Sequence, residues 1–184
     1  VLVMIGVAAV LLLSSPKYTT YETPVGGRKI LTLADGSRVE LNTNSVLRLS
    51  IDRSKREAIL DRGEAYFEIK HDPENPFVIR AQGRRIIDLG TKFVVRGGAG
   101  RLEVSMMEGA IALSAPQNSG DPPSELTAGD VAVATATSTV IKKAPLHVIA
   151  DAASWRQGML VFRQTTFADA VAEFNRYNDT QMVV

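Results

Sequence analysis

Apolar and polar residues alternate with a period of two over much of the chain, which is typical of β-strands with one buried face. The clearest run is Leu60–Ile69, in which the residues expected to face inward are Ala65, Phe67 and Ile69, with Tyr66 and Glu68 facing outward. Gly63 stands at the head of this run, where a positive φ would let the chain turn. The segment 71–76 contains two prolines and predicts a turn before the strand that begins at Phe77.

A hairpin is predicted around Asp35 and Gly36. A two-residue turn at these positions would place Leu31 opposite Glu40 and scatter the apolar residues over both faces. A three-residue loop over 34–36, with Gly36 in the left-handed region, pairs Leu31 with Val39 instead. We therefore predict the three-residue loop, which keeps four apolar residues on one buried face: Leu31, Leu33, Val39 and Leu41.

The strand pattern continues as far as Pro145 and predicts a mainly β domain over 26–145. A short sequence pattern recurs, in which a glycine precedes a run of alternating apolar residues. It occurs at Gly63, Gly109, Gly129 and Gly158. Its irregular spacing argues against a solenoid with a fixed sequence period. An antiparallel β-roll or sandwich and a β-solenoid-like stack of coils both remain open.

The first residues, Val1–Leu13, form an uninterrupted apolar run. A helix of this length spans about 20 Å, whereas a membrane crossing needs roughly 20 residues. A signal-peptide core or a buried helix would also fit. Because the sequence begins with Val rather than Met, we interpret residues 1–15 as the outer end of a transmembrane helix. Residues 16–25 are then expected to form a short tether.

The last segment, 150–184, changes character. Met159–Phe162 resembles a strand, and Thr166 with Asp169 predicts the start of a helix that continues to Tyr177. Residues 181–184 begin another strand-like run. We therefore predict a truncated β-α-β module after the main domain.

Composition excludes several classes of function. The net charge is +1 and the chain contains no cysteine, so neither a strong field for nucleic acid nor a disulfide or thiolate site is expected. The two histidines, His71 and His147, lack the spacing of a metal site, and no phosphate-binding loop or nucleophile elbow is present. We predict that the protein is not an enzyme and has no cofactor, metal or nucleic-acid partner.

Three separated motifs, Gly63–Ile69, Pro76–Ile79 and Leu89–Val95, resemble the signature of the FecR family. Their structural residues are expected to be Gly63, Phe67, Pro76, Phe77, Gly90, Thr91 and Phe93. The resemblance implies an anti-sigma regulator that crosses the bacterial inner membrane once and carries a β-rich periplasmic domain. Such a protein controls an extracytoplasmic-function sigma factor through a cytoplasmic segment, which this sequence does not contain.

The C-terminal segment resembles the first half of the short N-terminal domain of secretins and TonB-dependent receptors, on the residues Gly158–Phe162 and Phe174–Tyr177. The resemblance implies a contact with the N-terminal signalling domain of an outer-membrane TonB-dependent receptor that is loaded with an iron chelate or a glycan. The expected mode of contact is the pairing of an incoming strand with an exposed strand edge. The residues expected to make this contact are Met159, Leu160, Val161, Phe162, Arg163, Phe167, Phe174 and Tyr177.

Two alternatives remain open from the sequence. Trp155 could mark a binding hot spot, but we interpret it as packing within the core or between domains, because an indole buries a large area. The whole protein could instead be an exported structural or glycan-binding β-domain with no signalling role.

Overall fold

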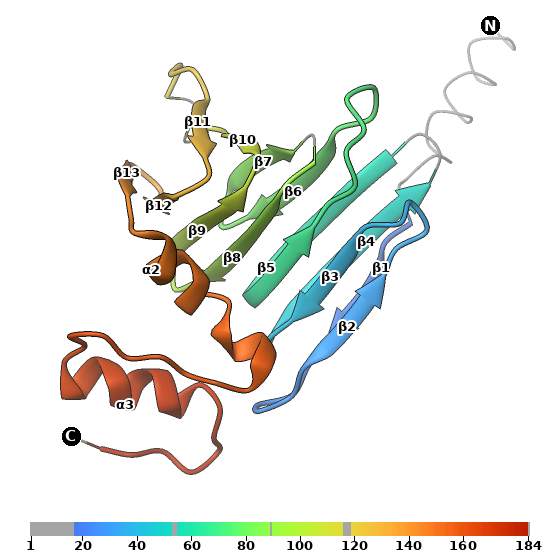
Figure 1. The fold of residues 1–184 in the computed structure, drawn as a ribbon. Helices are drawn as coiled ribbons and strands as arrows, with labels where there is room; N and C mark the ends of the chain where they lie inside the picture. The colour runs from blue at the N-terminus through green and yellow to red at the C-terminus, as the bar shows by residue number, and fades with distance from the viewer. Residues whose placement is uncertain (1–16, 53–54, 89, 116–118, 184) are drawn as a thin grey trace, which may run out of the picture.

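The computed structural model describes residues 17–52, 55–88, 90–115 and 119–183, which form a rolled β-sheet followed by short helices (Figure 1). The strands are β1 (Thr19–Glu22), β2 (Lys29–Thr32), β3 (Arg38–Leu41), β4 (Val46–Asp52), β5 (Lys55–Glu68), β6 (Phe77–Ala81), β7 (Arg84–Asp88), β8 (Lys92–Gly98), β9 (Arg101–Glu108), β10 (Ala110–Leu113), β11 (Ser124–Thr127), β12 (Asp130–Ala134) and β13 (Thr139–Lys143). After them come α2 (Leu146–Asp151), a 3-10 turn (Ser154–Gln157) and α3 (Phe167–Asn175). The predicted mainly β fold is confirmed.

The long strand β5 belongs to two sheets at once. Its first half pairs with β4 and, in parallel, with β6, and the first sheet runs β1-β4-β5-β6-β7-β10-β11. Its second half pairs with β3 and β8, and the second sheet runs β2-β3-β5-β8-β9-β12-β13. Both sheets therefore fold over one core as a rolled sandwich. Among the described residues, every strand pair except β5–β6 is antiparallel.

Gly63 lies where β5 passes from one sheet to the other, not at the head of a strand as the sequence pattern suggested. Its φ is +91°, and a Cβ added there would lie 2.5 Å from Cα of Ser45. The Ser45 hydroxyl accepts from the backbone N–H of Glu64 at 2.9 Å. The close crossing of Ser45 over β5 therefore requires glycine at this corner.

The aromatic motif residues join three strands inside the core. Phe67, Phe77 and Phe93 are fully buried. Phe67 stacks on Phe93 with ring centroids 5.5 Å apart and meets Phe77 edge-on at 6.4 Å. These contacts tie β5 to β6 and β8, because each ring comes from a different strand.

The remaining motif residues shape the connections around this core. Asp88 accepts from the backbone N–H of Gly90 at 2.8 Å and from the hydroxyl of Thr91 at 2.7 Å. Gly90 has a φ of +137°, and a Cβ there would lie 2.5 Å from Cα of His71. Pro76 is exposed and ends the loop that leads into β6.

The three-residue hairpin loop is confirmed. Leu31 pairs with Val39, and the backbone N–H of Leu33 donates to the carbonyl of Ser37 at 2.8 Å. Gly36 between them has a φ of +87°. All four apolar residues of the hairpin contact the main core, as the register argument predicted.

The residues that precede β2 differ in part from their predicted assignment. Thr19–Glu22 forms β1 and pairs with β4, so the interpretation of 16–25 as a tether is wrong for these residues. The proposed transmembrane segment 1–15 lies outside the described residues. No helix within the described ranges has the length and apolar character needed to cross a membrane.

Candidate functional site

The residues that follow β13 form a C-terminal arm, 146–183, which lies against one end of the sandwich (Figure 1). Tyr66 and Val94 point outward from the second sheet, yet both are buried because Ala153 and Trp155 of the arm pack over them. Trp155 is 4% exposed. The residue thus joins the arm to the β-domain.

An arginine of the arm covers the outer end of this apolar contact. The Arg156 guanidinium lies 3.6 Å from the ring centroid of Tyr66 and 2.6 Å from Oε1 of Glu40. Burial alone would lower the pKa of Arg156, but the hydrogen bond and the negative charge of Glu40 raise it. Arg156 therefore stays charged, and it links β3 to β5 on the outer face of the second sheet through its contacts with Glu40 and Tyr66.

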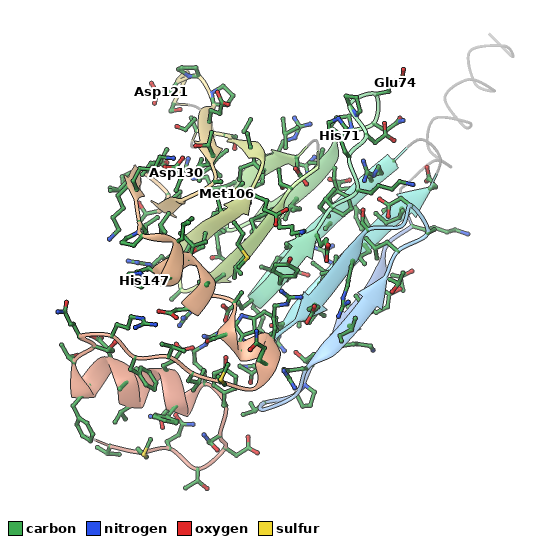
Figure 2. All side chains as sticks on the ribbon, viewed as in Figure 1. His71, Glu74, Met106, Asp121, Asp130 and His147 are labelled. Atoms are coloured by element: carbon green, nitrogen blue, oxygen red, sulfur yellow. The ribbon has the colours of Figure 1, made fainter. Side chains whose placement is uncertain are left out.

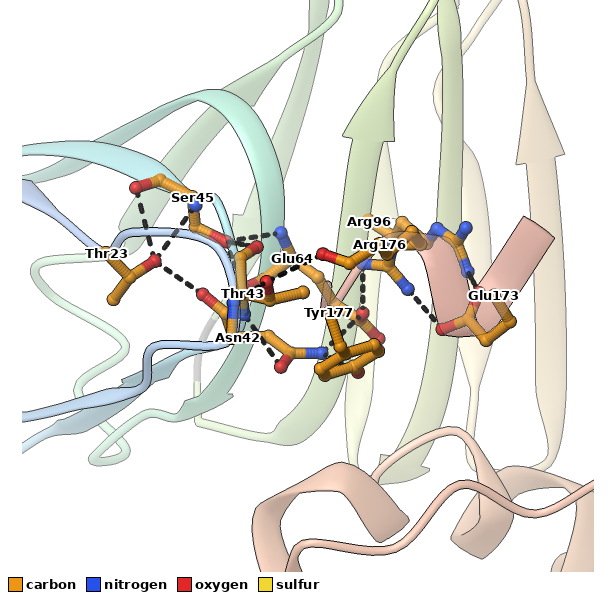
Figure 3. A network of polar contacts seen from close by, with 10 residues as sticks. Thr23, Asn42, Thr43, Ser45, Glu64, Arg96, Glu173, Arg176 and Tyr177 are labelled. Carbon is orange, nitrogen blue, oxygen red and sulfur yellow. Dashed lines mark hydrogen bonds and ion pairs between the residues drawn. The ribbon is translucent and has the colours of Figure 1, made fainter. Parts of the chain in front are cut away.

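A second group of polar residues, which we call the polar clasp, lies at the end of α3: Asn42, Glu64, Arg96, Glu173, Arg176 and Tyr177 (Figure 3). Arg176 lies 2.7 Å from Glu64 of β5 and also pairs with Glu173. Glu173 in turn accepts from Arg96 of β8 at 3.0 Å. Negative and positive side chains therefore alternate along a series that runs from β5 through the end of α3 and back to β8.

Neutral groups extend the polar clasp toward the turn before β4. The Asn42 amide donates to Glu64 at 2.9 Å and to the Tyr177 hydroxyl at 2.6 Å. The Thr43 hydroxyl donates to the carbonyl of Arg176 at 2.9 Å. Burial raises the pKa of the Tyr177 phenol, so this group stays protonated near neutral pH. Glu64 is thus buried with both a charged and a neutral partner, as a buried carboxylate requires.

Local chemistry explains why α3 forms. The Thr166 hydroxyl accepts from the backbone N–H of Asp169 at 3.1 Å and caps the first turn. The helix ends at Asn175, whose amide bonds both backbone groups of Met182, at 2.8 and 2.9 Å. The helix start was predicted correctly, while its end lies two residues earlier than Tyr177.

The strand predicted at Met159–Phe162 is wrong. These residues form neither helix nor strand, and 181–183 does not form a strand either. Extended backbone becomes a strand only when a neighbouring strand supplies its hydrogen bonds, and no strand pairs with either segment within the described chain. Of the predicted β-α-β module, only the helix is therefore present, and the segment before it is irregular.

Most of the residues expected to contact a partner are exposed together on the arm, and we call these its apolar face: Met159, Val161, Phe162, Phe167 and Phe174. Phe167 is 73% exposed, Met159 49% and Phe174 41%. The rings of Phe162 and Phe174 lie 5.3 Å apart, so the segment before α3 packs on the helix. Exposed apolar side chains that pack on one another, as Phe162 and Phe174 do, are typical of a protein-binding surface.

The other predicted contact residues have partners within the chain. Arg163 pairs with Asp151 of α2, Tyr177 belongs to the polar clasp, and Leu160 is half-buried. Sequence reasoning missed the polar clasp itself. Glu64 and Arg176 are 112 positions apart, and no local pattern indicates that such distant residues will pair.

The described residues contain no group of three or more His, Cys, Asp or Glu side chains placed to hold a metal ion. His71 lies in the loop before β6 and His147 on α2, at separate places on the molecule (Figure 2).

Comparison with solved structures shows which proteins share this fold. Two crystal structures of a candidate anti-sigma factor from Parabacteroides distasonis ATCC 8503 each superpose with a TM-score of 0.73 at 22% identity. The first match covers 88% of this chain and 75% of that protein, and the second covers 86% and 74%. A search of curated proteins found no match.

The family model described as "FecR protein" matches residues 19–112, which run from β1 into β10 and include all three motifs. The match thus covers the structural residues of β5, β6 and β8 and ends before the arm. The chain belongs to the FecR family.

Proposed function

We propose that this protein is a membrane-anchored anti-sigma regulator, in which the β-domain and the arm lie in the periplasm. Membership of the FecR family is the observation that carries this proposal. The shared fold with a candidate anti-sigma factor supports it. The apolar run Val1–Leu13 would form part of the single inner-membrane crossing, and a cytoplasmic segment would hold an extracytoplasmic-function sigma factor.

The arm is the part that would receive the signal. Its apolar face is exposed, while Ala153 and Trp155 pack on the second sheet and Arg176 joins the arm to β5 in the polar clasp. A partner that binds the apolar face can therefore act on the β-domain through α3. We propose that this partner is the N-terminal signalling domain of a TonB-dependent receptor.

Calorimetric titration with that signalling domain tests the proposal. The full periplasmic region should bind it, and a chain ending at Pro145 should not, because the truncation removes the whole arm. Equal binding by both chains would place the partner site on the β-domain. A reporter gene under the sigma factor should respond to the receptor's ligand only when the arm is intact, whereas an exported glycan-binding domain would leave the reporter unchanged.

A further inference from the structure

A groove of about 400 Å³ lies where the arm meets the start of the β-domain. Its walls combine Gly26 and Arg28, which precede β2, with side chains of the arm, chiefly Trp155, Met159 and Phe174. Ligand-binding pockets of this size are typically lined by apolar side chains, with a few polar groups that fix the orientation of the ligand. This groove has that composition.

The arm side of the groove is apolar and accessible. Met159 and Phe174 are exposed, while Trp155 is buried. Methionine and aromatic side chains are enriched where proteins bind one another, because they bury a large area and adapt to a partner's shape. An apolar side chain of a partner would therefore be stabilised between Met159 and Phe174.

Arg28 supplies the charge of the groove. Its Nη1 donates to the carbonyl of Trp155 and to that of Arg156, both at 2.8 Å, so the guanidinium is held against the arm. The other arginines that join the arm to the β-domain, Arg96, Arg156 and Arg176, each pair with a carboxylate. No acidic side chain of the described residues pairs with Arg28.

We infer that this groove binds a peptide segment that carries an apolar anchor residue beside a carboxylate, with the anchor between Met159 and Phe174 and the carboxylate on Arg28. A guanidinium fixed by two carbonyls is already oriented, so binding a carboxylate costs little further ordering. This inference rests on the proposed function, since it specifies the chemistry that the receptor's signalling domain would present to the arm.

The test uses the full chain in detergent micelles, which add no tryptophan, and a phage-displayed library of short peptides that lack tryptophan. Trp155 is the one tryptophan of the sequence and lines the groove, so its fluorescence reports occupancy directly. The selected peptides should share an apolar residue next to Asp or Glu and should change the Trp155 emission. Peptides in which Asn or Gln replaces the acidic residue should bind about tenfold more weakly. This difference corresponds to a loss of roughly 1.4 kcal/mol of binding free energy.

Two variants of groove residues and one control variant test whether the peptides bind in the groove or elsewhere on the surface. Arg28→Gln should weaken the acidic peptides by about tenfold and leave their amide counterparts unchanged. Arg85→Gln is the matched control, because Arg85 is exposed on β7 and its guanidinium makes no hydrogen bond or ion pair with the described residues. Met159→Glu should abolish binding of every selected peptide.

Three results would overturn the inference: selected peptides without acidic residues, binding with no change in Trp155 emission, or equal effects of Arg28→Gln and Arg85→Gln. Such results leave the proposed function standing if truncation at Pro145 still abolishes receptor binding. If the truncated chain binds the receptor fully while the peptides bind the groove, the proposed function fails and the groove remains a peptide site.

Discussion

Glycine is required at position 63 for two separable reasons, its backbone conformation and the space beside it. Gly100 has a similar positive φ of +73° but no atom within 4 Å of an added Cβ, whereas Gly63 meets Ser45. Gly63→Ala should therefore destabilise the protein by about 3 kcal/mol or more, and Gly100→Ala by about 1 kcal/mol. Urea unfolding measures both. Equal losses would mean that Ser45 moves aside freely.

The carboxylate of Glu57 is a second residue whose surroundings decide its chemistry. Burial opposes its ionisation, but hydrogen bonds from Lys55, Arg80 and Tyr18 outweigh it and lower the pKa from 4.5 to about 2. The unfolded chain therefore binds a proton at a higher pH than the folded chain, and stability is lost as the pH falls from about 4.5 toward 2.

Glu57→Gln should remove this component of the acid dependence. Its free energy of unfolding should change less than that of the parent between pH 4.5 and about 2, measured by urea titration at each pH. Glu125→Gln, on the exposed side of β11, serves as the control and should follow the parent. A parent and a Glu57→Gln variant with the same acid dependence would contradict the assignment.

At the scale of elements, α3 joins β5 through one ion pair, in which Glu64 is buried and Arg176 is half-buried. Arg176→Ala would leave Glu64 buried with only Asn42 as a partner, so we expect a loss of about 2–4 kcal/mol and faster amide exchange in α3. The double variant Glu64→Gln with Arg176→Ala should recover part of the loss, because it removes the unpaired charge.

Arg163→Ala is the matched control for this prediction, because it breaks an ion pair that is more exposed, with Asp151. We expect a change in the free energy of unfolding below about 1 kcal/mol and no faster amide exchange in α3. Comparable losses from Arg163→Ala and Arg176→Ala would show that the polar clasp has no special role in docking the arm.

At the scale of the whole molecule, the main core does not use the arm. The core cluster of the sandwich ends at Ala134, so a chain ending at Pro145 should still fold cooperatively. It would expose Tyr66 and Val94 and leave Glu64 without Arg176. We expect a free energy of unfolding about 2–4 kcal/mol lower and stronger binding of a hydrophobic dye. Failure to fold would make the arm part of the domain.

Features that depend on neighbours in the sequence were predictable. The alternation around Phe67 indicated the core face of β5, and the apolar pairs around Asp35 and Gly36 determined the hairpin register, because a slip of one residue would expose them. Thr166 and Asp169 marked the start of α3, since a cap acts within one turn. The FecR motifs were recognisable for the same reason, because each is contiguous.

Only the tertiary structure decided which strands share a sheet and which faces are covered. The alternating pattern of β5 cannot reveal that its two halves have different neighbours, or that Tyr66 lies beneath Trp155. Met159–Phe162 has strand-like residues but no strand beside it, so it forms no strand. Glu64 and Arg176 meet across 112 positions because the arm folds back over the sheet, and pairing over such a separation is a property of the packed molecule rather than of any local pattern.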